Sequence, residues 1–304
     1  METHINSTKA WALATRPKTL TGAAAPVLVG AAMAWHETGN ANFPVLPALL
    51  CLLFAFIMQI DANFINDYFD FQKGTDREDR LGPERACAQG WITPQAMRWG
   101  IGVTTLLGCG VGCLIMFCQQ QWELILIGLC CVVFCFLYTT HLSYLGLGDV
   151  LVLVFFGIVP VGFTCYVVTG GMWSSDLTLA GLAMGLATDN LLMVNNYRDR
   201  KQDKLSGKRT IVVHIIYIYG EETGAKVARW IYLGLGITAA SIAWIVINRV
   251  GSSLAGLMLI YMALHLYTYR KICMVDGKAL NKELGATARN IFLFGLLFAI
   301  AIAY

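Results

Sequence analysis

Long apolar stretches recur along the chain, and they constrain its fold more than any other feature of the sequence. The 304 residues are 57% hydrophobic and only 13% charged, and the mean hydropathy is +0.61. A soluble domain carries roughly twice that charged fraction. Runs of about 17–25 apolar residues are long enough to cross the roughly 30 Å hydrocarbon core of a bilayer as helices. We therefore expect an all-α integral membrane protein.

Nine stretches are candidate membrane spans, and together they predict a single polytopic domain over residues 1–304. Lys and Arg are enriched in loops on the cytoplasmic side of a membrane. Every Lys and Arg except Arg249 lies before the first span, or in and beside the loops after the second, sixth and eighth spans. We therefore expect a cytoplasmic N-terminus and an outward Tyr304, and the net charge of +3 does not suggest nucleic acid. The candidate spans are residues 20–36, 44–65, 98–118, 121–140, 149–170, 176–197, 229–248, 251–270 and 286–304.

Two Asp-rich motifs emerge on the same predicted face of the membrane. NDYFDFQKGTDREDR at 66–80 follows the second span, and NNYRDRKQD at 195–203 ends the sixth. The first opens a charged loop over about 66–97, and the second opens another over about 198–228. Because four crossings separate the motifs, both should emerge on the cytoplasmic side.

The spacing within each motif places its polar residues on one face of a helix, since residues at i and i+4 are neighbours there. Asn195, Asp199 and Asp203 form one such stripe. A second stripe is formed by Asn63, either Asn66 or Asp67, and Asp70. Asp76 comes after the turn residues Lys73-Gly74-Thr75 and can fold back towards the first stripe. The sequence therefore predicts two polar stripes that face each other.

Two facing acidic stripes make a poor anion site alone, but a good one with divalent cations between them. Mg²⁺ prefers a few carboxylate or amide oxygens together with phosphate oxygens of a substrate. The alternative is a pair of solvated helix ends capped by polar residues, which the matched side and spacing of two motifs disfavour. Basic side chains that could clamp the same phosphates flank both motifs: Lys73, Arg77, Arg80, Arg85, Arg198, Lys204, Lys208 and Arg209.

Four segments of the chain match a known family. They are RPKTL at 16–20 with APVLVG at 25–30, NDYFDFQKGTD at 66–76, LGPERACAQGWIT at 81–93 and NNYRDRKQDKLSGKRT at 195–210; GLGDVLVLVFFG at 146–157 adds to them. The chain resembles, over essentially its whole length, the UbiA superfamily of intramembrane prenyltransferases, which join an isoprenyl diphosphate to an aromatic or related acceptor.

Within this superfamily the resemblance is strongest to the branch that prenylates 1,4-dihydroxy-2-naphthoate, with loss of CO₂, in menaquinone biosynthesis. The spacing Asp70-x5-Asp76 is typical of that branch, whereas 4-hydroxybenzoate enzymes usually show Asp-x3-Asp. Here the x3 position is Gly74, which has no side-chain ligand.

The resemblance implies nine transmembrane helices in a bacterial inner membrane, around a central cavity that opens to the cytoplasmic side and to lipid. Two Mg²⁺ ions would grip the diphosphate of a polyprenyl diphosphate, whose apolar tail would lie along a lipid-facing groove. One ion would be held by Asn66, Asp70 and Asp76, and the other by Asn195, Asp199 and Asp203. The implied catalytic residues are Asp70, Asp76, Asp199, Asp203 and Tyr138, and the implied diphosphate contacts are Lys18, Lys73, Arg77, Arg198, Lys208 and Arg209.

Two aspartates lie inside predicted spans, where an ionisable residue is a functional candidate by default. Asp61 points about 180° away from Asp70 around the helix, which favours a hydrogen-bonded or water-facing residue between helices. Asp189 is placed where some naphthoate-type relatives carry an acid, so a role in orienting or deprotonating the acceptor is conceivable.

Two other functions fit parts of the sequence. One is a UbiA-type transferase with another acceptor such as 4-hydroxybenzoate. The other is a cation or metal-ion transporter, which should place its acids near mid-membrane on broken helices. The acids and bases of this chain instead cluster at one face. The oligomeric state is not readable from the sequence.

Overall fold

The computed structural model describes residues 4–39, 43–74, 80–142 and 145–304. Within these residues the chain is helical and contains no strand, so the predicted all-α class is confirmed. The helices in chain order are α1 (Thr8–Ala14), α2 (Pro17–Thr38), α3 (Val45–Gln72), α4 (Pro94–Gln119), α5 (Leu124–Leu137), η2 (Tyr138–Leu142), α6 (Gly148–Leu153), η3 (Val154–Ile158), α7 (Val159–Thr169), α8 (Ser175–Leu205), α9 (Ile211–Tyr219), α10 (Glu221–Arg249), η4 (Leu254–Leu257), α11 (Met258–Ile272), η5 (Gly277–Ala279) and α12 (Leu280–Ala303).

Helix occupies most of each predicted span, and in the described parts of the chain six segments are long and apolar enough to cross a membrane. A shorter apolar helix covers Leu124–Thr140. The chain is therefore a multi-pass membrane protein, and the count of nine crossings stays a prediction for α2, α5 and α11. The six segments are Val45–Gln72, Pro94–Gln119, Gly148–Thr169, Ser175–Leu205, Glu221–Arg249 and Gly277–Ala303.

Both Asp-rich motifs are more helical than predicted. α3 continues to Gln72 and α8 to Leu205, beyond the apolar runs that begin them. Within the predicted loop over 198–228, the end of α8, the whole of α9 and the start of α10 are helical. The physical reason is the spacing of the polar residues: they share one face, so the other faces of the helix continue to pack.

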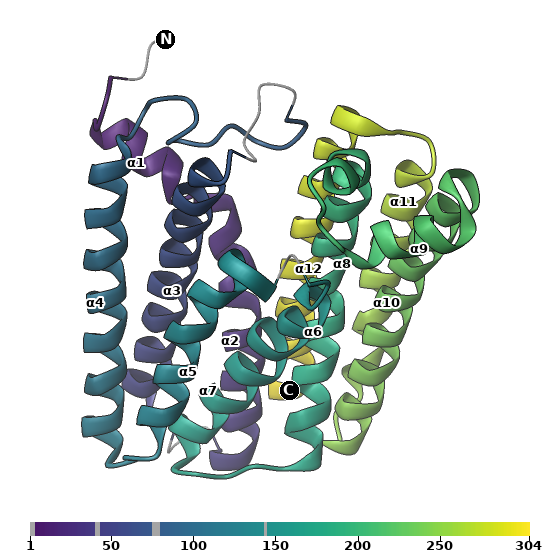
Figure 1. The fold of residues 1–304 in the computed structure, drawn as a ribbon. Coiled ribbons are helices and arrows are strands. Elements are labelled where there is room, and N and C mark those ends of the chain that lie inside the picture. The colour runs from purple at the N-terminus through teal and green to yellow at the C-terminus, as the bar shows by residue number, and fades with distance from the viewer. Residues whose placement is uncertain (1–3, 40–42, 75–79, 143–144) are drawn as a thin grey trace.

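Small residues bring the helices of the bundle close together. One apolar core joins α2, α7, α8, α10, α11 and α12, and Figure 1 shows these helices running side by side. Gly157 of η3 approaches α8 so closely that a Cβ there would lie 2.5 Å from the carbonyl oxygen of Gly181. Such contacts are typical of helix packing in membranes, where small residues let backbones approach.

Gly30 makes a similar close approach between α2 and α7, and its replacement tests this packing. A Cβ on Gly30 would lie 2.4 Å from the carbonyl oxygen of Val161 and 2.8 Å from the Cβ of Thr164. We expect Gly30→Ala to destabilise the fold by about 1–3 kcal/mol, because the backbones must separate. Thermal unfolding in detergent measures this loss.

Gly22 supplies the matched control, because it lies on the same helix and a Cβ added to it would meet no atom within 4 Å. Gly22→Ala should leave the unfolding temperature unchanged or raise it, since Ala has the higher helix propensity. Equal effects of the two substitutions would contradict the close packing of α2 on α7.

Candidate active site

The two Asp-rich motifs lie at the same end of the bundle, where α3 and α8 end (Figure 1). We call this end of the bundle the charged end. It comprises residues 66–74 of the first motif, the second motif and the residues that follow it to 209. The chain that follows the first motif reaches α8 directly. Asn281 of α12 donates through Nδ2 to the carbonyl oxygen of Leu81 at 2.7 Å and accepts from Arg198 at 2.7 Å. A Cβ on Gly82 would lie 2.9 Å from a guanidinium nitrogen of Arg198.

In the first motif, Asn66 and Asp70 both have partners on other elements. Asn66 accepts a hydrogen bond from the hydroxyl of Thr139 in η2. Asp70 is buried, and its Oδ2 lies 2.7 Å from a guanidinium nitrogen of Arg85. The side chains of Asn66 and Asp70 are both expected to hold metal. Asn66 therefore faces η2, and Asp70 faces the segment that follows α3.

Asp67 and Asn63, which neighbour this stripe, have structural partners instead. Asp67 is 1% exposed and accepts two backbone N–H bonds, from Ala86 and Cys87, each at 2.9 Å. Asn63 donates to the carbonyl oxygen of Thr15 at 2.9 Å. Asp67 thus fixes the segment that carries Arg85, and it is a positioning residue that sequence reasoning did not separate from the metal stripe.

In the second motif, Arg198 holds the other predicted ligands. Its guanidinium is 2% exposed and binds both carboxylate oxygens of Asp199, at 2.8 and 2.6 Å, and the amide oxygen of Asn195 at 2.6 Å. Asp203 is also buried and lies within electrostatic reach of Lys208, Asp199 and Arg198. The stripe predicted from the spacing is therefore present, and an arginine binds two of its members.

Lys73 and Lys208 connect the two motifs electrostatically. Lys73 donates from Nζ to the carbonyl oxygens of Thr139 and Thr140, at 3.1 and 2.8 Å. Burial lowers the pKa of the Lys73 ammonium and Lys208 lowers it further, while Asp70 opposes both effects. Lys208 follows the second motif, and it lowers the pKa of Lys73 in the first. Cations of the two motifs therefore lie close together.

A glycine and a cap fix where Lys208 lies. Gly207 adopts φ +75°, a left-handed conformation that favours glycine, and the Lys208 amide donates to the carbonyl oxygen of Asp203 at 2.9 Å. Thr210 then caps α9 by accepting from the Val213 amide at 3.3 Å. The turn therefore folds Lys208 back over the end of α8.

Tyr138 begins the π-helical turn η2, which contacts both α3 and α6. Its phenol is within electrostatic reach of Asp70 of the first motif and of Asp149 and Asp189 on α6 and α8. Tyr138 is thus placed between the first motif and the interior of the bundle, as a residue near the reacting centre would be.

Two of the predicted site residues, Lys18 and Arg209, are not brought to this point by the described contacts. Asp76 and Arg77 lie outside the described residues. Lys18 is exposed on the first turn of α2, where the neighbouring Arg16 lies 3.9 Å from Asp67 instead. Arg209 is exposed, and its carbonyl oxygen packs against Gly146.

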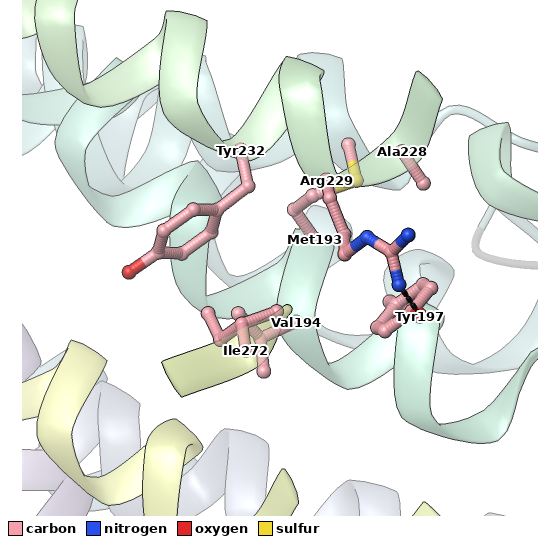
Figure 2. A pocket seen from close by; sticks show the side chains of 7 residues that line it. All are labelled: Met193, Val194, Tyr197, Ala228, Arg229, Tyr232 and Ile272. Atoms are coloured by element: carbon pink, nitrogen blue, oxygen red, sulfur yellow. Dashed lines mark hydrogen bonds between the residues drawn. The ribbon is translucent and has the colours of Figure 1, made fainter. Parts of the chain in front are cut away.

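The opposite face of α8 is anchored and does not belong to the site. Figure 2 shows Tyr197 on this face, with its hydroxyl accepting from Arg229 of α10 at 2.9 Å. Arg200 binds both carboxylate oxygens of Asp276 at 2.8 Å and one oxygen of Glu221 at 3.0 Å. These contacts fix the rotation of α8 and so aim its other face at the first motif.

The described residues fit a hard cation only when a substrate supplies some of its ligands. Among them, no three His, Cys, Asp or Glu side chains are grouped so as to hold a metal ion by themselves. Each motif offers amide and carboxylate oxygens and no soft ligand, and Mg²⁺ commonly takes one or two carboxylates with substrate phosphates. The residues therefore fit Mg²⁺ bound together with a phosphorylated substrate.

Sequence reasoning missed two residues of this end of the bundle and one in its interior. Thr139 and Asn281 bind the motifs through side chains, but neither belongs to a recognisable pattern. Asp149 was visible as an acid directly before an apolar run, in GLGDVLVLVFFG, and received no role.

These features define a class: a multi-pass α-helical membrane protein whose acidic and basic side chains gather at one end of an apolar bundle. The model of the UbiA prenyltransferase family matches residues 23–302, and the chain belongs to this family. It is 32% identical to the 1,4-dihydroxy-2-naphthoate octaprenyltransferase of Escherichia coli K12, over 99% of this chain and 97% of that protein. It is 31% identical to the Mycobacterium tuberculosis protein of the same name, over 96% of this chain and 95% of that protein.

Solved structures share the fold. A UbiA homologue from Aeropyrum pernix K1 superposes with a TM-score of 0.72 at 12% identity, covering 92% of this chain and 97% of that one. A UbiA homologue from Archaeoglobus fulgidus bound to GPP and Mg²⁺ gives a TM-score of 0.59 at 14% identity, covering 96% and 99%. At these identities the likeness shows the fold alone.

Asp67 provides a test of how the first motif is built. Asp67→Ala leaves the Ala86 and Cys87 amides without their acceptor, at a cost of about 1–3 kcal/mol. We expect hydrogen exchange at these two amides to accelerate by roughly tenfold to a hundredfold. Glu84→Gln, an exposed change in the same segment, is the control and should leave exchange unchanged. Unaltered protection in Asp67→Ala would contradict its positioning role.

Proposed function

We propose that this member of the UbiA family transfers a polyprenyl group from a polyprenyl diphosphate to 1,4-dihydroxy-2-naphthoate. The products are CO₂, diphosphate and demethylmenaquinol, a step of menaquinone biosynthesis. Support comes from relatives named for this reaction, which match 31–33% of residues, two of them over nearly the whole chain. The naphthoate-type spacing of Asp70 and Asp76 agrees with this acceptor.

The observation that carries the proposal is the meeting of the two motifs at one end of the bundle. Arg198 joins the second motif to Asn281, and Asn281 joins it to Leu81 beyond the first motif. Lys73 and Lys208 add positive charge from both sides. A diphosphate placed between the motifs would meet oxygen ligands for cations and basic side chains together.

Mg²⁺ fits this arrangement, and we propose two ions, one held by Asn66, Asp70 and Asp76 and the other by Asn195, Asp199 and Asp203. When bound, Mg²⁺ would stabilise the charge that develops on the departing diphosphate. A UbiA homologue of the same fold is described as bound to GPP and Mg²⁺, which supports this assignment.

Side chains of the protein would bind the diphosphate and stabilise the allylic cation. Lys208 and Lys73 can donate hydrogen bonds to diphosphate oxygens, and their ammonium groups cannot ligate a metal. Arg198 keeps Asp199 oriented and can share its remaining hydrogen-bonding capacity with the diphosphate. The Tyr138 ring can stabilise the allylic cation, and the apolar bundle keeps water from it.

The proposed setting is a bacterial inner membrane, with nine crossings and the charged end in the cytoplasm. The distribution of Lys and Arg supports this orientation, since Arg249 alone falls at the other predicted face. The central cavity would open to the cytoplasmic side and to lipid, which accommodates the polyprenyl tail.

The purified chain should form the prenylated and decarboxylated naphthoate product when given polyprenyl diphosphate, 1,4-dihydroxy-2-naphthoate and Mg²⁺, as measured by mass spectrometry. EDTA should stop the reaction and Mg²⁺ should restore it. Asp70→Asn should lower kcat by at least about a hundredfold, because a ligand to the leaving-group charge is weakened.

Asp176→Asn is the control, because Asp176 pairs with Arg249 at 2.9 Å at the start of α8, whereas the second motif lies at the end of that helix. This variant should retain activity. Preference for 4-hydroxybenzoate would overturn the acceptor, and full activity of Asp70→Asn or of the EDTA-treated protein would overturn the metal site.

A further inference from the structure

Two carboxyl groups in the interior of the bundle each have one oxygen that is shielded from solvent and has no hydrogen-bond partner among the described residues. Asp189 of α8 is 4% exposed, and its Oδ1 has no partner among the described residues. Asp149 of α6 also has an Oδ1 that is shielded from solvent without a partner there. Buried polar atoms are nearly always hydrogen-bonded, so each exception calls for an explanation.

Asp61 shows what a structural aspartate looks like in the same protein. It is fully buried in α3, yet Oδ1 accepts from Thr104 at 2.5 Å and Oδ2 accepts from Thr105 at 2.8 Å. This confirms the expected hydrogen-bonded role between helices. Asp149 and Asp189 differ from it, because the bundle provides no donor for their Oδ1 atoms within the described part of the chain.

These two carboxyl groups lie near each other, on helices that pack closely. A Cβ on Gly148 would lie 3.3 Å from Leu192, which is one turn beyond Asp189 on α8. Asp149 and Asp189 also interact electrostatically. The two residues therefore form one pair, held by the contact of α6 with α8.

The pair lies beside the proposed reacting centre. Tyr138 is within electrostatic reach of both carboxyl groups and of Asp70. The helix that carries Asp149 lies between two π-helical turns, η2 and η3. Such turns are rare and frequently occur at functional sites. Two independent features of the backbone and side chains thus point to a ligand here.

The best partner for each Oδ1 is a hydrogen-bond donor, because a carboxyl group keeps an accepting oxygen whether or not it carries a proton. A diphosphate is an acceptor and a polyprenyl chain is apolar, so neither substrate group fits. The hydroxyl groups of a phenolic acceptor do fit. We propose that Asp149 and Asp189 bind a phenolic hydroxyl of the acceptor, an inference that rests on the proposed function and assigns the acceptor end of the site.

This placement also orients the ring. The carboxylate of a naphthoate would be repelled by the two aspartates and would point towards the cations at the charged end. The hydroxyl on the neighbouring ring carbon would then face the pair. Two adjacent substituents of the ring are thus recognised differently, the hydroxyl by hydrogen bonding and the carboxylate by charge.

The pair can serve as the proton acceptor for the transfer. As the ring carbon that bears the carboxylate bonds to C1 of the prenyl chain, the C1–O bond breaks and its electron pair leaves with the diphosphate. The neighbouring hydroxyl gives its proton to an oxygen of the pair and becomes a carbonyl. Loss of CO₂ then returns the electron pair of the broken C–C bond to the ring, and the proton returns to the oxygen.

Binding of two naphthoates to the full-length protein tests the assignment. The probes are 1,4-dihydroxy-2-naphthoate and 2-naphthoate, which lacks hydroxyls, titrated by fluorescence with Mg²⁺ and an unreactive prenyl thiolodiphosphate present. Asp189→Asn should weaken binding of the dihydroxy compound by roughly tenfold, the loss of one charge-assisted hydrogen bond. Binding of 2-naphthoate should not weaken, and kcat should fall while KM for the prenyl diphosphate stays unchanged.

Asp61→Asn is the matched control, since it changes a buried aspartate that already has two donors. It should leave the ratio of the two affinities unchanged. If Asp189→Asn aggregates, Asp149→Asn on the other helix should give the same selective loss. Equal weakening of both naphthoates, or of neither, would overturn the proposal.

The test separates this inference from the proposed function. If the wild-type protein prenylates 4-hydroxybenzoate instead of the naphthoate, the proposed acceptor fails. The probes then become 4-hydroxybenzoate and benzoate, and selective loss of the hydroxyl compound in Asp189→Asn would still support the hydroxyl-binding pair. Absence of that selectivity would overturn it.

Discussion

The buried guanidinium of Arg198 is the interaction on which the charged end depends. A buried charge is tolerated only when partners satisfy it, and removing one partner of such a pair costs about 3–5 kcal/mol. Arg198 has Asn195, Asp199 and Asn281 as partners, and Asn281 extends the contact to Leu81. One side chain therefore orders the second motif and ties it to the segment that follows the first.

This arrangement also explains why the charges gather at one end. The interior of the bundle is built mostly from apolar residues, which can neither hydrate a charge nor donate to it. Aspartates inside it need a specific donor, which Thr104 and Thr105 provide for Asp61. Asp149 and Asp189 have one oxygen each without a partner in the described chain, and we assign its partner to the substrate. The charged end would then bind the diphosphate and the carboxyl pair would bind the acceptor, with Tyr138 between them.

The sequence predicted the fold class and the helical polar stripe of the second motif well, because both follow from periodicity. Apolar length indicated the helices, and the i, i+4 spacing placed Asn195, Asp199 and Asp203 on one face. The sequence did not predict partners that are set by tertiary contacts. Nothing in the sequence marks Asn281 as a partner of Arg198, about 80 residues away along the chain. Asn66 and Asp67 are neighbours, yet only Asp67 binds the segment after α3. This difference depends on where two backbone amides of that segment lie, which no local sequence pattern encodes.

Binding of Mn²⁺ in place of Mg²⁺ tests the central claim that two motifs hold one diphosphate. Electron paramagnetic resonance, with an unreactive prenyl thiolodiphosphate bound, counts the ions and detects coupling between them. We predict about two spin-coupled Mn²⁺ ions per chain, each interacting with phosphorus. Asp70→Asn and Asp199→Asn should each abolish the coupling. Uncoupled ions, or a spectrum that neither substitution changes, would contradict a shared site between the motifs.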